Sequence, residues 1–192
     1  MRLVHHKIST EHYHKMIDAG ILTEKDKVEL IKGEIIDMSP IGKVHNAIVD
    51  RMANLLKEIA QQQVIIRTQG SIHLPPESEP EPDIVLLKPR ADFYAAELPQ
   101  PADVFLVIEV AKSSWEYDYE VKRPLYAEAG IPELWLVNLN KHEMEVHRAP
   151  QNGTYKEISI KQLGDMVKLP VPDCDTAIRM EDLIGPKPTS SL

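Results

Sequence analysis

Apolar residues recur at helical spacing in three parts of the chain. The three patterns cover 10–20, 44–59 and 114–129. Ser9 or Thr10 can cap the first helix at its start, and Gly20 ends it. The second pattern ends in a run of three glutamines, and the third is stopped by Gly130. We therefore expect three helices, of which the second is the longest.

Between these helices lie short runs rich in β-branched and other apolar residues. One hairpin is expected around Lys32-Gly33, and a second is expected to join 64–68 to 71–74. Further strands are expected over 83–87, 104–110, 134–138, 143–148 and 155–160. Because strands and helices interleave, the fold class is α/β or α+β, with a central mixed β-sheet flanked by α-helices. The chain is expected to form a single domain over 1–185 with a flexible C-terminal tail over 186–192.

An acid interrupts the most apolar of these strands. The run Val104–Val110 is continuously hydrophobic, which is typical of a central strand buried on both faces, yet it contains Glu109. Alternation along the strand places this acid on the same face as Phe105 and Val107. A buried carboxylate costs several kcal/mol unless a cation, a metal or a proton accompanies it. Glu109 is therefore a candidate functional residue.

A second acid, Asp83, opens its own apolar strand directly after Pro82. If this strand and Val104–Val110 are neighbours, Asp83 and Glu109 converge on one point. Two carboxylates, a backbone carbonyl and water suit Mg²⁺ or Mn²⁺. The alternative is structural, with Asp83 in a turn and Glu109 paired with an arginine.

Lys122 lies in the third helical pattern, on the same face as Asp118 and Tyr126. A lysine there can reach over the end of a strand, although Lys122 taken by itself favours the interpretation as a solvated helix residue. Pro124 removes a helical hydrogen bond. Either the regular helix begins near Lys122 or the helix is kinked there.

Composition limits the class of protein. Acidic residues outnumber lysines and arginines by 30 to 22, so the net charge is −8. Proteins that bind polyanions without specificity usually carry a basic surplus, so a nucleic-acid partner would need a local basic site or metal ions. The single cysteine, Cys174, excludes an internal disulfide and a thiolate metal cluster. The apolar runs are too short to cross a bilayer, and no signal-peptide pattern begins the chain, so we expect a cytoplasmic protein with no membrane partner.

The histidines near the N-terminus raise the possibility of a zinc site. His12 and His14 are two residues apart, whereas two zinc ligands on one helix face need a spacing of four. His45 begins the long helix, where it is either a polar residue of the first turn or part of a cleft lining. The polar loop 88–101 is a candidate flap.

Several motifs together resemble the Uma-two family of restriction endonucleases, over roughly residues 8–148. The resemblance rests on their order along the chain, because a single Pro-Asp pair would carry no information. The matching segments are Val28-Glu-Leu-Ile-Lys-Gly-Glu-Ile, Met38-Ser-Pro, His45, Glu81-Pro-Asp-Ile-Val, Leu106-Val-Ile-Glu-Val-Ala-Lys-Ser-Ser, Tyr117-Asp, Lys122 and Tyr126-Ala-Glu-Ala-Gly-Ile-Pro-Glu-Leu-Trp-Leu-Val.

This resemblance implies a restriction-endonuclease-like fold of the PD-(D/E)XK superfamily, with a metal-dependent phosphodiesterase site. Carried over by position, Asp83 and Glu109 are the two metal-binding acids, and Glu29 is an early acid that can approach the metal. The superfamily usually has a lysine two residues after the second acid, where this chain has Ala111. In this family the lysine is displaced into the next helix, at Lys122, with Lys112 as the rival candidate.

The resulting hypothesis is a Mg²⁺- or Mn²⁺-dependent endonuclease that acts on DNA. Two alternatives stay open: a catalytically silent nucleic-acid or protein-binding module on the same fold, and a metal-dependent hydrolase of another phosphoester. Nucleases of this type often cut both strands as dimers, so we expect a homodimer by analogy. Any sequence specificity would come from loops such as 88–101.

Overall fold

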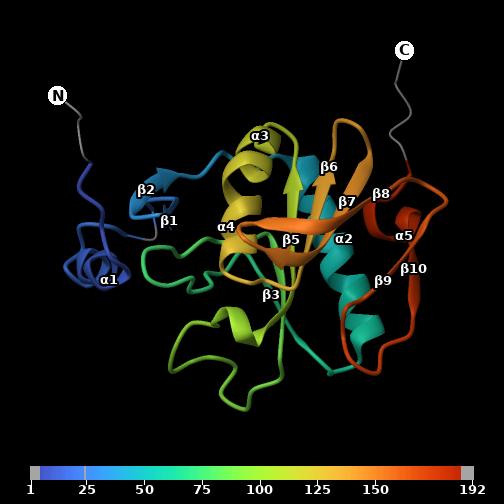
Figure 1. Ribbon diagram of the computed structural model, residues 1–192, viewed down its shortest axis with the longest axis horizontal. Coiled ribbons are helices and arrows are strands. Elements are labelled where there is room, and N and C mark those ends of the chain that lie inside the picture. Colours follow the sequence, from blue (N-terminus) through green and yellow to red (C-terminus); the bar gives the residue numbers. More distant parts are fainter. Residues whose placement is uncertain (1–4, 24, 187–192) are drawn as a thin grey trace.

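A six-stranded mixed sheet forms the centre of the protein (Figure 1). The computed structural model describes residues 5–23 and 25–186. Strand β5 pairs in parallel with β6, and the other neighbours in the sheet are antiparallel. In spatial order the strands are β3 (Ile65–Thr68), β4 (Ile84–Leu87), β5 (Val104–Ala111), β6 (Glu133–Asn138), β7 (Glu143–Gln151) and β8 (Thr154–Lys161).

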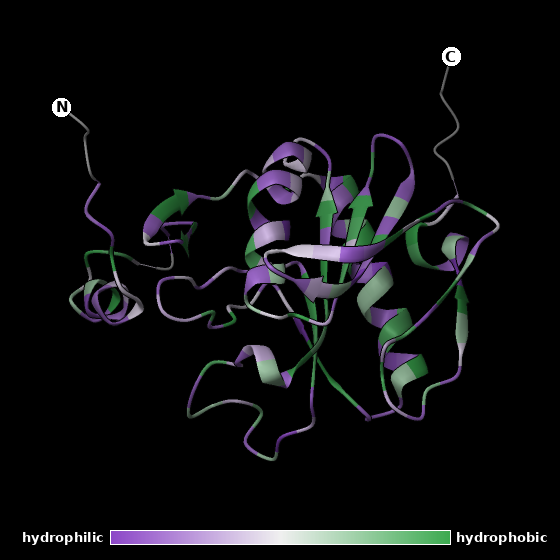
Figure 2. Ribbon diagram, viewed as in Figure 1, coloured by the Kyte–Doolittle hydropathy of each residue, from purple (hydrophilic) through white to green (hydrophobic). Residues whose placement is uncertain are grey.

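Helices cover both faces of this sheet. Helix α2 (Lys43–Ala60) and the short α5 (Met180–Ile184) pack on one face. The other face carries α3 (Trp115–Tyr117), a π-helical turn over Asp118–Lys122, and α4 (Arg123–Glu128). Figure 2 shows hydrophobic colouring along β5 and β6, whereas α2 alternates between hydrophobic and hydrophilic residues. The mixed sheet flanked by helices that the sequence predicts is confirmed.

Each face of the sheet has its own hydrophobic core. Met52 and Leu56 of α2 pack with Ile108 and Trp135 on one side. On the other side, Tyr126 of α4 packs with strand residues that include Val107 and Leu134. Each such fully buried side chain contributes roughly 1.5–3 kcal/mol relative to leaving it exposed. The two cores fix the positions of the strand ends, where the site lies.

Smaller elements flank the sheet. Helix α1 (Thr10–Asp18) and the hairpin of β1 (Val28–Ile31) and β2 (Glu34–Asp37) lie together on one side of the molecule (Figure 1). A second small antiparallel pair consists of β9 (Met166–Lys168) and β10 (Ala177–Arg179), and a 3₁₀ turn covers Pro101–Asp103. No helix among the described residues has the length and apolar character to cross a bilayer. Apart from Pro186, the predicted tail lies outside the described residues.

The predicted hairpin of 64–68 with 71–74 is wrong. Strand β3 pairs instead with β4, with Ile66 opposite Leu86, and 71–73 form no strand. The loop after β3 is held by other contacts, since the Ile72 amide donates to the Pro80 carbonyl. The turn signal at Gln69-Gly70 is local, whereas the strand takes its partner from farther along the chain.

The prediction that Glu109 shares a face with Phe105 is also wrong. The β4–β5 register shifts between Leu86 and Leu87, because Leu86 pairs with Leu106 while Leu87 pairs with Val104. This β-bulge reverses the alternation before Leu106. Phe105 therefore packs against the core under α2. Val107 belongs to the core under α4, and its position on the face of Glu109 is as predicted.

Loop 88–101 is not a flap over the predicted site. It joins the end of β4 to the start of β5, whereas Asp83 precedes β4 and Glu109 lies near the end of β5. The two strands are antiparallel, so the loop lies at one end of the strands and both acids lie at the other end (Figure 1).

Pro124 is accommodated by a widened turn. The Arg123 amide donates to the Asp118 carbonyl, which is the five-residue spacing of a π-helix. Regular helix then resumes with Pro124 in its first turn, where a missing amide hydrogen costs little. Of the two alternatives considered for this segment, the structure is close to the first, since α4 begins at Arg123.

Candidate active site

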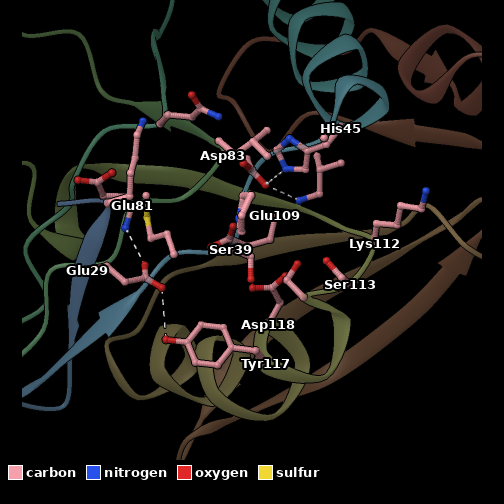
Figure 3. Close-up of a pocket in the computed structure, with 18 of the residues that line it drawn as sticks. Glu29, Ser39, His45, Glu81, Asp83, Glu109, Lys112, Ser113, Tyr117 and Asp118 are labelled. Atoms are coloured by element: carbon pink, nitrogen blue, oxygen red, sulfur yellow. Dashed lines mark hydrogen bonds and ion pairs between the residues drawn. The ribbon is translucent and has the colours of Figure 1, made fainter. Parts of the chain in front are cut away.

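Asp83 and Glu109 lie at one end of the sheet because their strands are neighbours. Ile84 of β4 pairs with Ile108 of β5, which places Asp83 beside the end of β5. The Val110 amide donates a hydrogen bond of 2.8 Å to Oδ2 of Asp83. Both acids line a cleft of about 790 Å³ (Figure 3).

Glu109 is almost fully buried, with 3% of its surface exposed. Its Oε1 accepts hydrogen bonds from the Tyr126 hydroxyl at 2.6 Å and from Nζ of Lys122 at 3.3 Å. Burial raises the pKa of Glu109 to about 8, and the negative charges of Asp118 and Asp83 add to the rise, while Lys122 opposes it. The protein therefore holds a carboxyl that is easily protonated near neutral pH unless more positive charge is present.

Lys122 projects from the π-helical turn into the group of acids and is 6% exposed. Its Nζ lies 3.1 Å from Oε2 of Glu29 and 3.3 Å from Oε1 of Glu109. Burial alone would lower the pKa of Lys122, but Glu109, Glu29 and Asp118 together raise it. The lysine is thus a fixed positive charge between two buried carboxylates.

Glu29 reaches the same group from strand β1. It is 2% exposed, accepts a hydrogen bond of 3.1 Å from the Glu81 amide, and accepts a second of 3.3 Å from the Tyr117 hydroxyl. These contacts connect the small hairpin to the segment before β4 and to α3 (Figure 3). The structure therefore brings all four predicted site residues, Asp83, Glu109, Lys122 and Glu29, to one cleft.

Asp118 is a further member of the site that the sequence analysis does not assign. It is 5% exposed, and burial raises its pKa to about 6, an effect that Lys122 and a hydrogen bond with Ser114 oppose. Its spacing from Lys122 was the available signal, because residues four apart share a helix face. Figure 3 shows its side chain directed towards Glu109.

His45 contacts Asp83 from the first turn of α2. Its Nε2 lies 3.0 Å from Oδ2 of Asp83, and the residue lines the cleft. Burial lowers the pKa of His45, but the hydrogen bond with Asp83 and its charge outweigh this and raise it. The cleft position that the sequence left as one of two possibilities is the observed one.

Lys112, the rival lysine, does not join the acids. Its side chain is exposed and points away from Asp83 and Glu109 at the edge of the cleft (Figure 3). Lys122 is the buried lysine among the described residues of this cleft, whereas five buried or half-buried acids line it: Glu29, Glu81, Asp83, Glu109 and Asp118. The site carries an excess of negative charge.

This donor set fits a divalent cation in its chemistry. Carboxylate oxygens are the ligands that Mg²⁺ and Mn²⁺ prefer, and the charge excess favours a cation. The contacts described above use Oδ2 of Asp83 and Oε1 of Glu109, and the second oxygen of each would be the donor to a metal. No three His, Cys, Asp or Glu side chains in 5–23 and 25–186 are already arranged as a metal cage. A metal held by Asp83 and Glu109 would therefore take its remaining ligands from water or from the substrate.

The buried acids also predict how the metal-free protein responds to pH. The pKa of Glu109 is raised by folding from 4.5 to about 8, so this group favours the folded state below pH 4.5, and the benefit is lost as the pH rises through 8. Between pH 6.5 and 8 we expect the free energy of unfolding to fall by about 2 kcal/mol from this group. His45, whose pKa is also raised, changes stability in the same direction.

Urea denaturation in EDTA at both pH values measures this change, and Glu109→Gln is the matched variant. It should lose most of the dependence, since the amide does not titrate. An equally steep pH dependence in the variant would contradict the assignment to Glu109.

Comparison with known proteins agrees with this architecture. A model of the Uma2 family, described as "Putative restriction endonuclease", matches residues 10–179. A solved structure described as a putative nuclease belonging to DUF820 from Anabaena variabilis ATCC 29413 is similar over 92% of this chain and 97% of that chain. The TM-score is 0.71 and the identity is 18%, a likeness that shows the fold alone. No curated protein matches the chain.

Proposed function

We propose, from the premise that the chain belongs to the Uma2 family of restriction endonucleases, that it is a Mg²⁺- or Mn²⁺-dependent endonuclease that hydrolyses DNA phosphodiester bonds. The observation that carries the proposal is the group of Asp83, Glu109 and Lys122 at one end of the sheet, open to a cleft. These are the acid, acid and lysine of the PD-(D/E)XK pattern, with the lysine supplied by the following helix. We further propose that the enzyme works as a homodimer.

Each residue of the group would have a distinct task. Asp83 and Glu109 would hold the metal, which when bound polarises a phosphoryl oxygen and lowers the pKa of an attacking water. Tyr126 and the Val110 amide orient these two carboxylates through their hydrogen bonds. Lys122 would orient the attacking water or stabilise the charge that develops on the phosphate. Glu29, by pairing with Lys122, holds its ammonium group in place.

A plasmid assay tests the proposed activity. Purified protein with Mn²⁺ or Mg²⁺ is expected to nick or linearise supercoiled DNA, and EDTA is expected to stop the reaction. Glu109→Ala, purified in the same way, is the control for a contaminating nuclease. Absence of cleavage by the wild type with either metal would contradict the nuclease proposal and favour the binding module.

Three lysines at the edge of the cleft support a polyanionic substrate. Lys27, Lys43 and Lys112 line the cleft, are exposed, and form no ion pair with a carboxylate within the described part of the chain. Lys43 also stands at the start of α2, where the helix dipole favours an anion. A protein of net charge −8 would therefore present local positive charge where a phosphate backbone enters.

A triple variant in which glutamine replaces Lys27, Lys43 and Lys112 is expected to bind duplex DNA more weakly. Its binding should also depend less on the salt concentration. Each phosphate contact contributes about 0.9 to the slope of log K against log salt, so the slope should become shallower by about 2–3. Fluorescence anisotropy at several salt concentrations, in a Lys122→Ala background with Mg²⁺, measures it. Lys57→Gln, at the far end of α2, is the control. An unchanged slope in the triple variant would show that DNA does not cross this edge.

A further inference from the structure

Strand β8 exposes two large apolar side chains at the edge of the central sheet. Ile158 is 49% exposed and Ile160 is 54% exposed, and Leu163 and Met166, which follow the strand in sequence, are exposed as well. Native edge strands normally avoid this, because a long apolar edge is a template for pairing with another chain. At the opposite edge, by contrast, Ile65 and Ile66 of β3 are half-buried, with Ile66 packed against the core under α2 and Ile65 against the core under α4.

The outer side of β8 is available for strand pairing. In the sheet formed by the described residues, β8 stands last in the order and pairs with β7 alone. Most of its side chains are exposed. Its outward backbone groups therefore have no strand partner within that part of the chain.

We propose that a second copy of this chain adds to this edge, with the two β8 strands antiparallel and centred on Ser159. In a two-fold pair of this kind, residues that lie opposite each other point to the same face of the sheet. Odd-numbered residues of β8 point to one face and even-numbered residues to the other. A possible register therefore pairs odd-numbered residues with odd-numbered ones and even-numbered residues with even-numbered ones. Centring on Ser159 places Ile158 opposite Ile160 of the second copy, and Ile160 opposite Ile158. On the other face, Glu157 lies opposite Lys161 of the second copy, and the symmetry repeats that ion pair.

The neighbouring registers lack this complementarity. Centring on Glu157 brings two like charges together on the axis, which destabilises a cross-strand pair. Centring on Ile158 places Lys156 opposite Ile160 and leaves Glu157 opposite Ser159. Only the Ser159 register pairs both isoleucines and both opposite charges, which is why a second copy of this chain, rather than another protein, fits the edge. The proposal uses no feature of the cleft, so it stands or fails separately from the nuclease proposal.

A cysteine at the axis tests the register. In the Cys174→Ser background of the full chain, Ser159→Cys places two thiols on paired residues whose Cα atoms would be about 4.5–5.5 Å apart, within disulfide range. Mild oxidation is expected to give a covalent dimer in high yield. Lys156→Cys is the matched control, because the two copies of this residue would be about 20 Å apart at roughly 3.3 Å per residue. Equal cross-linking of both variants, cross-linking of neither, or cross-linking of Lys156→Cys alone would each overturn the proposal.

Charge reversal tests the ion pairs in the uncross-linked protein. Sedimentation velocity is expected to show a dimer for the wild type, and Glu157→Lys or Lys161→Glu should raise its dissociation constant at least about tenfold, because each reversal changes two symmetric pairs. The double variant that carries both reversals should recover the dimer, since the introduced lysine of one copy would then face the introduced glutamate of the other. A wild-type monomer at every concentration, or a double variant no better than the single ones, would overturn the proposal. Circular dichroism verifies that every variant is folded.

Discussion

Asp83→Asn and Glu109→Gln are each expected to abolish Mn²⁺ binding and, with it, DNA cleavage, while the fold stays intact. Each substitution keeps the shape of the side chain and removes one anionic oxygen donor from the pair that would hold the metal. The amide at position 109 can still accept a hydrogen bond from Tyr126, which lies 2.6 Å from Oε1 of Glu109. Because the site carries more negative than positive charge, loss of one carboxylate also relieves repulsion in the metal-free protein.

Isothermal titration calorimetry with Mn²⁺ measures the loss, and thermal unfolding verifies the fold. Asp37→Asn is the matched control, since this acid lines the same cleft but is exposed at the end of β2. It should bind Mn²⁺ like the wild type. Unchanged Mn²⁺ affinity in both the Asp83 and the Glu109 variants would refute the proposed metal site.

The convergence of Asp83 and Glu109 could be predicted because both acids occupy positions where acids are costly. A carboxylate inside a continuously apolar strand needs a compensating group nearby, and a second acid at the mouth of another apolar strand supplies the partner for a site. Lys122 could be placed by its helix face. These inferences depend on periodicity and on the free energy of burying charge, both of which are local properties of the sequence.

The remaining features depend on information that the sequence does not display locally. Asp83 precedes β4 and Glu109 lies near the end of β5, so the two acids meet only if the strands are antiparallel, and the loop 88–101 that joins the strands then lies at the opposite end of the sheet. The bulge that turns Phe105 to the other face arises from the pairing of two strands. Asp118 shares a helix face with Lys122 by its spacing, but its almost complete burial depends on the packing of this segment against the sheet and could not be predicted from the spacing alone.

Lys122→Ala is expected to lower the cleavage rate by about 10²–10³-fold, which is typical for loss of one positioned electrostatic donor in the transition state. Metal binding should persist, and the affinity should rise if anything, because a fixed positive charge next to Glu109 opposes a cation. Removal of this lysine also leaves Glu29 and Glu109 buried without their partner, which destabilises the metal-free fold. Lys122→Met, which fills the same space without the charge, is therefore tested beside it, with both variants handled in Mg²⁺.

Single-turnover cleavage and Mn²⁺ calorimetry on the same preparations separate stabilisation of the transition state from metal binding. Lys112→Ala is the matched control, because Lys112 lies at the edge of the same cleft and points away from the acids (Figure 3). At saturating DNA it should keep most of its cleavage rate, because the proposed contact of Lys112 with the phosphate backbone affects DNA binding and not the chemical step. An inactive Lys112 variant beside an active Lys122 variant would mean that the lysine is wrongly assigned. Full activity in both would leave the carboxylates as the only catalytic groups, because neither lysine would then stabilise the transition state.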